Sequence, residues 1–208
     1  MSPGNLHDEP RILNTLRAFI AVDLPPDVRT QLDAMTGRLR CLPGQECMRF
    51  VAASGIHLTL KFLAEISPDL VAGVHNVLDD AASSVPGLTI RIRGVGCFPN
   101  SRQPRVLWVG LDDPRGMLKT LQRAVEEGCA RLKLPAEDRP FSPHLTLGRV
   151  RREAGAGAGA FVRSVLESER TLDFGEMPVD AVHLFRSDLR PSGAVYSRLH
   201  SAALGGGT

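Results

Sequence analysis

The tetrapeptide His-Leu-Thr-Leu occurs twice in this chain, at 57–60 and at 144–147, although the sequence contains only six histidines. The two copies are separated by 144 − 57 = 87 residues. The same offset superimposes two apolar segments upstream, 19–24 (FIAVDL) and 106–111 (VLWVGL), each followed within three residues by proline. Similarity at one fixed offset indicates an internal repeat. The repeat constrains the fold because both copies must then be built from the same order of elements.

Each copy of the repeat predicts a strand, a helix, a connection and a second strand. Apolar residues spaced three or four apart follow each upstream segment, as on one face of an amphipathic helix. They are Val28, Leu32, Met35 and Leu39 in the first copy and Leu118, Leu121, Val125 and Cys129 in the second. Further strands are predicted near 88–97 and after 171, and a further helix over 68–82. Because helices and strands do not alternate strictly, the pattern favours an α+β fold over a parallel doubly wound sheet.

The length of 208 residues fits one domain, which we place at 15–204, between a loose tail at 1–14 and a frayed end at 205–208. The segment AGAGAGA at 154–160 predicts a flexible loop. A net charge of +2 argues against a protein that coats nucleic acid through charge alone, but it is compatible with binding one short end. Four scattered cysteines and the lack of a signal peptide predict a cytoplasmic protein with free thiols. We expect a monomer without a membrane span.

The two His-x-Thr motifs are the candidate functional residues. Alternation along a strand places His57 and Thr59 on one face and the leucines between them on the other, and the same holds for His144 and Thr146. A single motif of this kind is most often structural. Two copies on equivalent strands would bring two imidazoles and two hydroxyls to a cleft between the copies.

Three kinds of chemistry compete for such a set. A metal site is disfavoured because neither motif brings a Cys, Asp or Glu beside its histidine, so no metal or cofactor is expected. A serine triad is disfavoured because the sequence has no Gly-x-Ser-x-Gly motif. In-line displacement at phosphorus fits better: one histidine accepts a proton from water and the other donates one to the leaving oxygen. Threonine hydroxyls would stabilise the charge on the non-bridging oxygens.

The segments HLTLKFL and SPHLTLGR, together with LRAFIAVDLP, PRVLWVGL and VHLFRSDLRPSGAVYSRL, resemble the 2H phosphoesterases. Within them, the flanking segments resemble the bacterial and archaeal RNA 2′,3′-cyclic phosphodiesterases of the LigT type, formerly called 2′-5′ RNA ligases. The resemblance covers about 17–204. It implies two lobes, each an antiparallel sheet with helices, related by a pseudo-twofold axis around a cleft. It also implies metal-free opening of a 2′,3′-cyclic phosphate at an RNA 3′ end to a 2′-phosphomonoester.

The resemblance also implies roles for individual residues. His57 would donate a proton to the ribose 3′ oxygen, and His144 would activate water. Thr59 and Thr146 would hold the phosphate. Arg149 stands where the family usually has arginine and would pair with phosphate or ribose.

Other assignments rest on position alone. Lys61 shares a face with His57 by strand alternation, and Arg105 opens a central strand, so both are candidates for binding the substrate. Ala64 departs from the family, because many members carry glycine there. Phe19, Phe50 and Tyr196 are the candidates for stacking a base. The substrate stays open among RNA termini, tRNA halves and small cyclic nucleotides, and the alternatives are 2′-5′ ligation and a non-catalytic module that binds RNA ends.

Overall fold

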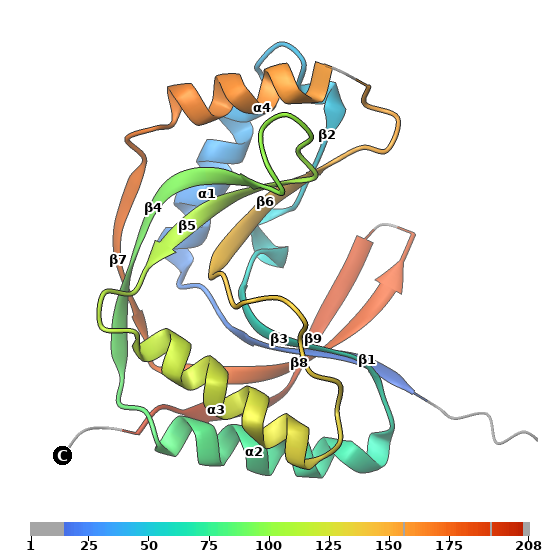
Figure 1. Ribbon diagram of the computed structural model, residues 1–208, viewed down its shortest axis with the longest axis vertical. Coiled ribbons are helices and arrows are strands. Elements are labelled where there is room, and N and C mark those ends of the chain that lie inside the picture. The colour runs from blue at the N-terminus through green and yellow to red at the C-terminus, as the bar shows by residue number, and fades with distance from the viewer. Residues whose placement is uncertain (1–14, 156, 192, 206–208) are drawn as a thin grey trace, which may run out of the picture.

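The computed structural model describes residues 15–155, 157–191 and 193–205, and two antiparallel sheets form its framework (Figure 1). The first sheet has the order β3-β1-β8-β9 and the second the order β2-β6-β5-β4-β7. The strands of the first sheet are β1 (Leu16–Val22), β3 (Leu58–Ile66), β8 (Ala181–Arg190) and β9 (Gly193–Ala203). Those of the second are β2 (Met48–Phe50), β4 (Leu88–Phe98), β5 (Val106–Asp112), β6 (His144–Val150) and β7 (Asp173–Val179). The expected α+β fold with two lobes is confirmed.

In the part of the chain that the structure describes, four helices cover the outer faces of the sheets: α1 (Pro26–Leu39), α2 (Val71–Ser83), α3 (Met117–Arg131) and α4 (Gly157–Ser168). Short 3-10 turns occupy Gln45–Cys47, Ala53–Gly55 and Pro68–Leu70. In Figure 1, α2 and α3 lie together under the first sheet, and α1 and α4 lie against the second. Among the described residues, no helix combines the length and the apolar character needed to cross a lipid bilayer.

The helices of the repeat are exchanged between the lobes. Helix α1 follows β1 of the first sheet but contacts β7 of the second, and α3 follows β5 of the second sheet but contacts β3 of the first. All eight apolar residues predicted to form the inner faces of α1 and α3 are buried. Their side chains join those of both sheets in one continuous hydrophobic cluster. The two lobes therefore share a single core.

Helix α4 begins inside the AGAGAGA segment, so the prediction of a flexible loop over 154–160 is wrong for its second half. Alanine has the highest helix propensity, and Ala158 is buried against the core. A Cβ atom on Gly159 would lie 3.2 Å from the backbone oxygens of Ser101 and Arg102. The glycine therefore allows the helix to approach the loop between β4 and β5 closely.

The predicted ends of the chain lie partly outside the described residues, which exclude 1–14 and 206–208. At the C-terminal boundary, Leu204 is buried, and Gly205 forms an isolated bridge with Pro86.

The strand pairing repeats at the same offset of 87 residues. Partners are Phe19 with Phe62, Ile20 with Lys61 and Ala21 with Thr59 in the first sheet, and Val106 with Arg149, Leu107 with Gly148 and Trp108 with Thr146 in the second. In both sheets the pairing skips the last leucine of His-Leu-Thr-Leu, which is Leu60 or Leu147. An extra residue of this kind is a β-bulge. Because alternation has a period of two, the side chains after each bulge change faces.

A second irregularity in β3 lies close to Ala64, whose φ is +55°. Residues other than glycine pay about 1–2 kcal/mol in this left-handed region, because Cβ crowds the backbone. This conformation gives a physical reason for the glycine that the family resemblance implies at this position. Ala64 is exposed, so its side chain contributes little packing in return.

We expect Ala64→Gly to raise the free energy of unfolding by about 0.5–1 kcal/mol, because relief of the strain exceeds the entropy that glycine adds to the unfolded chain. Urea unfolding measures the change. The control is Ala203→Gly in β9, where the exposed alanine lies in an extended strand and the same replacement should destabilise by a similar amount. Equal destabilisation by both replacements would contradict the strain at Ala64.

Candidate active site

A cavity of about 120 Å³ lies where the two lobes meet, and three of the predicted site residues line it: His57, Thr146 and Arg149. His57 directly precedes β3 of the first sheet, whereas Thr146 and Arg149 lie on β6 of the second. Tyr196 of β9 closes the same cavity from the first sheet. Side chains from distant parts of the chain thus converge from both copies of the repeat.

His57 is held between two aromatic rings. Its imidazole stacks on Phe19 with ring centroids 4.4 Å apart, and it makes a T-shaped contact with Tyr196 with centroids 5.3 Å apart. Burial lowers the pKa of His57 to about 4; a hydrogen bond with the backbone of Gly55 partly offsets this, and the positive charge of Arg29 adds to it. His57 is therefore neutral in the free protein at neutral pH.

His144 is oriented by a hydrogen bond within its own chain segment. Its Nδ1 lies 2.7 Å from the carbonyl oxygen of Ser142, which can only accept, so Nδ1 carries the proton and Nε2 is the unprotonated nitrogen of the neutral ring. Ser142 precedes His144 by two residues, as Gly55 precedes His57. Burial lowers the pKa of His144 below 6.5; the Ser142 backbone opposes the shift, and Arg149 reinforces it. The two histidines are thus presented in the same way.

The two threonines lie on the same side of the sheets as the histidines. Thr59 is paired with Ala21, which belongs with Phe19 and Tyr196 to a small cluster on the cleft side of the first sheet. Thr146 is paired with Trp108 and lines the cavity. The alternation expected for each His-x-Thr motif holds up to the bulge that follows it.

Arg29 of α1 holds the segment that leads into His57. Its Nη1 donates hydrogen bonds to the carbonyl oxygens of Ala53 at 2.8 Å and Ile56 at 3.2 Å, and its guanidinium pairs with Asp23. Arg198 of β9 binds the other oxygen of Asp23 at 2.7 Å. No motif in the sequence marks Arg29, because its partners are brought to it only by the packing of α1.

Lys61 does not reach the site, and the prediction that it shares a face with His57 is wrong. The bulge at Leu60 turns it into the interior, where it is 3% exposed. Its Nζ donates hydrogen bonds to Glu126 of α3 at 2.7 Å and to the carbonyl oxygen of Pro135 at 2.8 Å. Lys61 thus joins β3 to the exchanged helix.

Arg105 and Phe50 also lie away from the cavity. Arg105 is exposed just before β5, and its backbone hydrogen bonds join Phe98 and Val150. The Phe50 ring packs against the core under the guanidinium of Arg40, which lies 5.6 Å from the ring centroid. Neither residue is among those that line the cavity at His57.

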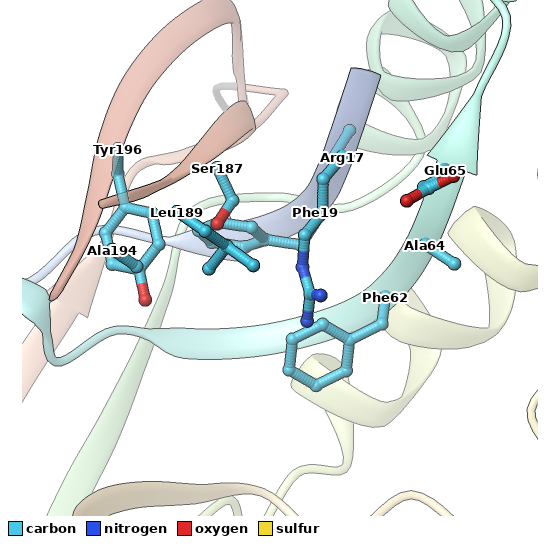
Figure 2. Close-up of a pocket in the computed structure, with 10 residues that line it drawn as sticks. Arg17, Phe19, Phe62, Ala64, Glu65, Ser187, Leu189, Ala194 and Tyr196 are labelled. Atoms are coloured by element: carbon cyan, nitrogen blue, oxygen red, sulfur yellow. The ribbon is translucent and has the colours of Figure 1, made fainter. Parts of the chain in front are cut away.

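A larger pocket of about 590 Å³ adjoins the first, and Tyr196 lines both (Figure 2). Phe19, Phe62 and Leu189 supply apolar walls, and Figure 2 shows the Arg17 guanidinium extending toward the Phe62 ring. Phe62 is 55% exposed and Leu189 is 70% exposed, so this surface is open to a flat ligand. Phe62 was not predicted, although the repeat could have identified it: Phe62 is the counterpart of Arg149, 87 residues later.

The chain matches known proteins over most of its length. The family model of the 2′-5′ RNA ligase superfamily matches residues 14–191. A protein from Thermus thermophilus is 37% identical over 201 residues, covering 92% of this chain and 91% of the relative. A protein from Methanothermobacter thermautotrophicus is 32% identical over 182 residues, covering 88% and 95%. Both of these relatives are named RNA 2′,3′-cyclic phosphodiesterase.

Solved structures agree with this similarity. The crystal structure of TT0787 from Thermus thermophilus superimposes with a TM-score of 0.74 at 31% identity, covering 92% of this chain and 99% of that one. The crystal structure of Escherichia coli LigT complexed with 3′-AMP gives a TM-score of 0.70 at 28% identity, with the same coverage.

The burial of His57 predicts a pH-dependent stability. Its folded pKa of about 4 lies below the unfolded value of 6.5, so the unfolded state binds the proton first as pH falls. We expect this one group to lower the free energy of unfolding by about 2 kcal/mol between pH 7 and pH 5. Urea unfolding at both values measures the loss, and His57→Asn should remove that part of it. An NMR titration of the His57 ring with a midpoint near 6.5 would contradict the burial.

Proposed function

The chain belongs to the 2′-5′ RNA ligase superfamily of 2H phosphoesterases, and from that premise we propose that it hydrolyses 2′,3′-cyclic phosphate ends of RNA to 2′-phosphomonoesters. One observation carries the proposal. Two histidines from equivalent positions of the repeat each engage the backbone two residues upstream, and His57 shares a cavity with Thr146 and Arg149 of β6, the strand that begins at His144. Such a pair suits a reaction that takes a proton on one side of phosphorus and gives one on the other.

The proposed reaction balances with water as the only co-substrate. His144 accepts a proton at Nε2 from the attacking water, whose oxygen forms a bond to phosphorus in line with the leaving 3′ oxygen. The bond between phosphorus and the 3′ oxygen breaks, and that oxygen takes a proton from His57. The bond to the 2′ oxygen stays intact, which gives the 2′-phosphomonoester. Proton exchange with solvent restores the two histidines.

Because both imidazoles are partly buried, the charge of the bound substrate affects how readily they are protonated. In the free protein the pKa of each histidine is lowered, so the protonated form of His57 that the reaction needs is scarce at neutral pH. A phosphodiester bound between the rings carries a negative charge, which favours an imidazolium. Binding of the substrate therefore raises the fraction of protein with one charged and one neutral histidine.

The remaining polar groups would stabilise the charge that develops on phosphorus. Thr59 and Thr146 can donate hydrogen bonds to the two non-bridging oxygens from opposite lobes. Arg149 lines the same cavity and presents a planar fork that suits phosphate. The strands on which these groups lie pack against the shared core.

The larger pocket gives a place for the terminal nucleoside. Tyr196 packs against His57, and Phe62 lines the same larger pocket as Tyr196. Unpaired bases are commonly recognised by stacking on such aromatic rings. The pocket also offers Ser187 and Arg17 for polar contacts to a base edge. These residues support a nucleotide end as the substrate over a simple cyclic phosphodiester.

We expect His57→Ala and His144→Ala each to reduce kcat by about 10²–10⁴-fold on a short oligoribonucleotide that ends in a 2′,3′-cyclic phosphate. The double variant should lose far less than the product of the two effects, because the pair acts as one unit. Phosphorus NMR of the product should show a 2′-phosphate.

Two results would contradict this mechanism. One is a near-normal rate in either single variant with an unchanged fold. The other is loss of wild-type activity in EDTA that zinc or manganese restores, because the proposed proton transfers use imidazoles alone. Within the described residues, no three His, Cys, Asp or Glu side chains are arranged to hold a metal ion.

The pH dependence should differ between the free and the substrate-bound protein. The profile of kcat/KM reports the free protein, in which both pKa values are lowered, so its bell should be centred below pH 6.5. The profile of kcat reports the complex, in which the phosphate anion raises both values, so its centre should lie at higher pH. Initial rates between pH 4 and pH 9 measure both. A kcat bell at lower pH than the kcat/KM bell would contradict the role of the bound anion.

A further inference from the structure

Two arginines lie directly opposite each other at the edge of the second sheet. Arg49 on β2 is paired with Arg149 on β6 in an antiparallel register. Residues in such a pair project to the same face with Cβ atoms about 4.5–5.5 Å apart. Arg149 lines the cavity at His57, so the side chain of Arg49 also lies on the cleft side of the sheet.

The neighbouring pair confirms this orientation. Met48 and Val150 are the next partners in the register, and both pack against the hydrophobic core. Since successive residues on a strand face opposite sides, Arg49 and Arg149 must face away from the core. Both arginines are exposed.

Like charges directly across a strand pair destabilise a sheet unless an opposite charge lies between them. Some other arginines of this protein have such a partner, among them Arg29, Arg91 and Arg93, which each form an ion pair with an aspartate. Among the residues that the structure describes, neither Arg49 nor Arg149 forms an ion pair with a carboxylate. Two guanidinium groups that project from paired positions on one face without a counter-charge suit the binding of an anion.

The position of this pair indicates which anion. β2 is the edge strand of its sheet, so Arg49 lies one strand further out than Thr146 and Arg149. Arg151 continues the positive row along the same strand end, where its N–H donates a hydrogen bond to the carbonyl oxygen of Cys47. Positive charge therefore extends from the cavity to the rim of the second sheet. An RNA strand carries its next phosphate on the 5′ oxygen of the terminal nucleotide.

We propose that Arg49, opposite Arg149, binds the first internal phosphodiester of an RNA strand, and that this contact makes an oligonucleotide a better substrate than a mononucleoside 2′,3′-cyclic phosphate. The inference rests on the proposed function, and it adds the length of the substrate to it. Arg49 touches neither the reacting phosphate nor the histidines in this arrangement. Its role in the proposal is to favour a longer RNA strand over a mononucleotide.

The test compares Arg49→Gln with the wild type on two substrates, a trinucleotide that ends in a 2′,3′-cyclic phosphate and the corresponding cyclic mononucleotide. We expect kcat/KM for the trinucleotide to fall about 10- to 100-fold, the effect of removing one charged hydrogen-bonding contact. We expect less than a twofold change for the mononucleotide. The slope of log kcat/KM against log salt for the trinucleotide should become shallower by about 0.7, the value for one phosphate contact in a single strand.

Two control variants sharpen the comparison. Arg170→Gln removes the same charge from an exposed arginine in the turn between α4 and β7, and it should leave both substrates and the salt slope unchanged. Arg49→Lys keeps the charge but loses the planar fork, so it should recover part of the activity on the trinucleotide.

The remaining outcomes distinguish a failure of the Arg49 contact from a failure of the proposed function. If wild type hydrolyses both substrates with equal kcat/KM, or if Arg49→Gln affects both substrates equally or neither, the specificity role is wrong and the proposed function stands. If wild type hydrolyses neither substrate, the proposed function fails and this inference fails with it.

Discussion

The bulge at the last leucine of each His-Leu-Thr-Leu motif is the constraint on which the cleft depends. Regular alternation from His144 would put Arg149 on the buried face, where an unpaired guanidinium is costly. Skipping Leu147 moves Arg149 to the cleft, and skipping Leu60 moves Lys61 in the opposite direction, into the core. Each motif can therefore present its histidine and threonine and still return its leucines to the core.

The two copies have the same bulge, but the residues that follow it differ. After it, the first copy places Lys61 inside and Phe62 in the cleft, whereas the second places Gly148 inside and Arg149 in the cleft. The charge of Lys61 is compensated by Glu126 of the exchanged helix α3, and this ion pair connects the two copies of the repeat. A Cβ atom on Gly148 would lie 3.1 Å from the carbonyl oxygen of Arg49, so glycine permits the close approach of β2. A symmetric scaffold thus carries an asymmetric cleft, apolar on one side and charged on the other.

The shared core and the partial burial of the two histidines depend on the same packing of α1 and α3. Because α1 and α3 cover each other's lobes, the strands that carry the two motifs cannot move apart without opening the core. Packing around the imidazoles keeps them partly desolvated, which lowers the pKa of both. In the mechanism that we propose, the negative charge of a bound phosphodiester favours the proton that one histidine must carry.

The features that the sequence determines by itself are local or periodic. The 87-residue repeat, the buried faces of α1 and α3 and the common face of each His-x-Thr pair all follow from spacing along one segment, which needs no knowledge of a partner. The bulges, the burial of Lys61, the clamp made by Arg29 and the pairing of Arg49 with Arg149 depend on the register between strands and on the packing of exchanged helices. Helix α4 likewise forms where composition alone favours a loop, because its small residues can pack closely against the loop between β4 and β5. Only the tertiary structure decides these features, since their energies come from contacts between residues far apart in the chain.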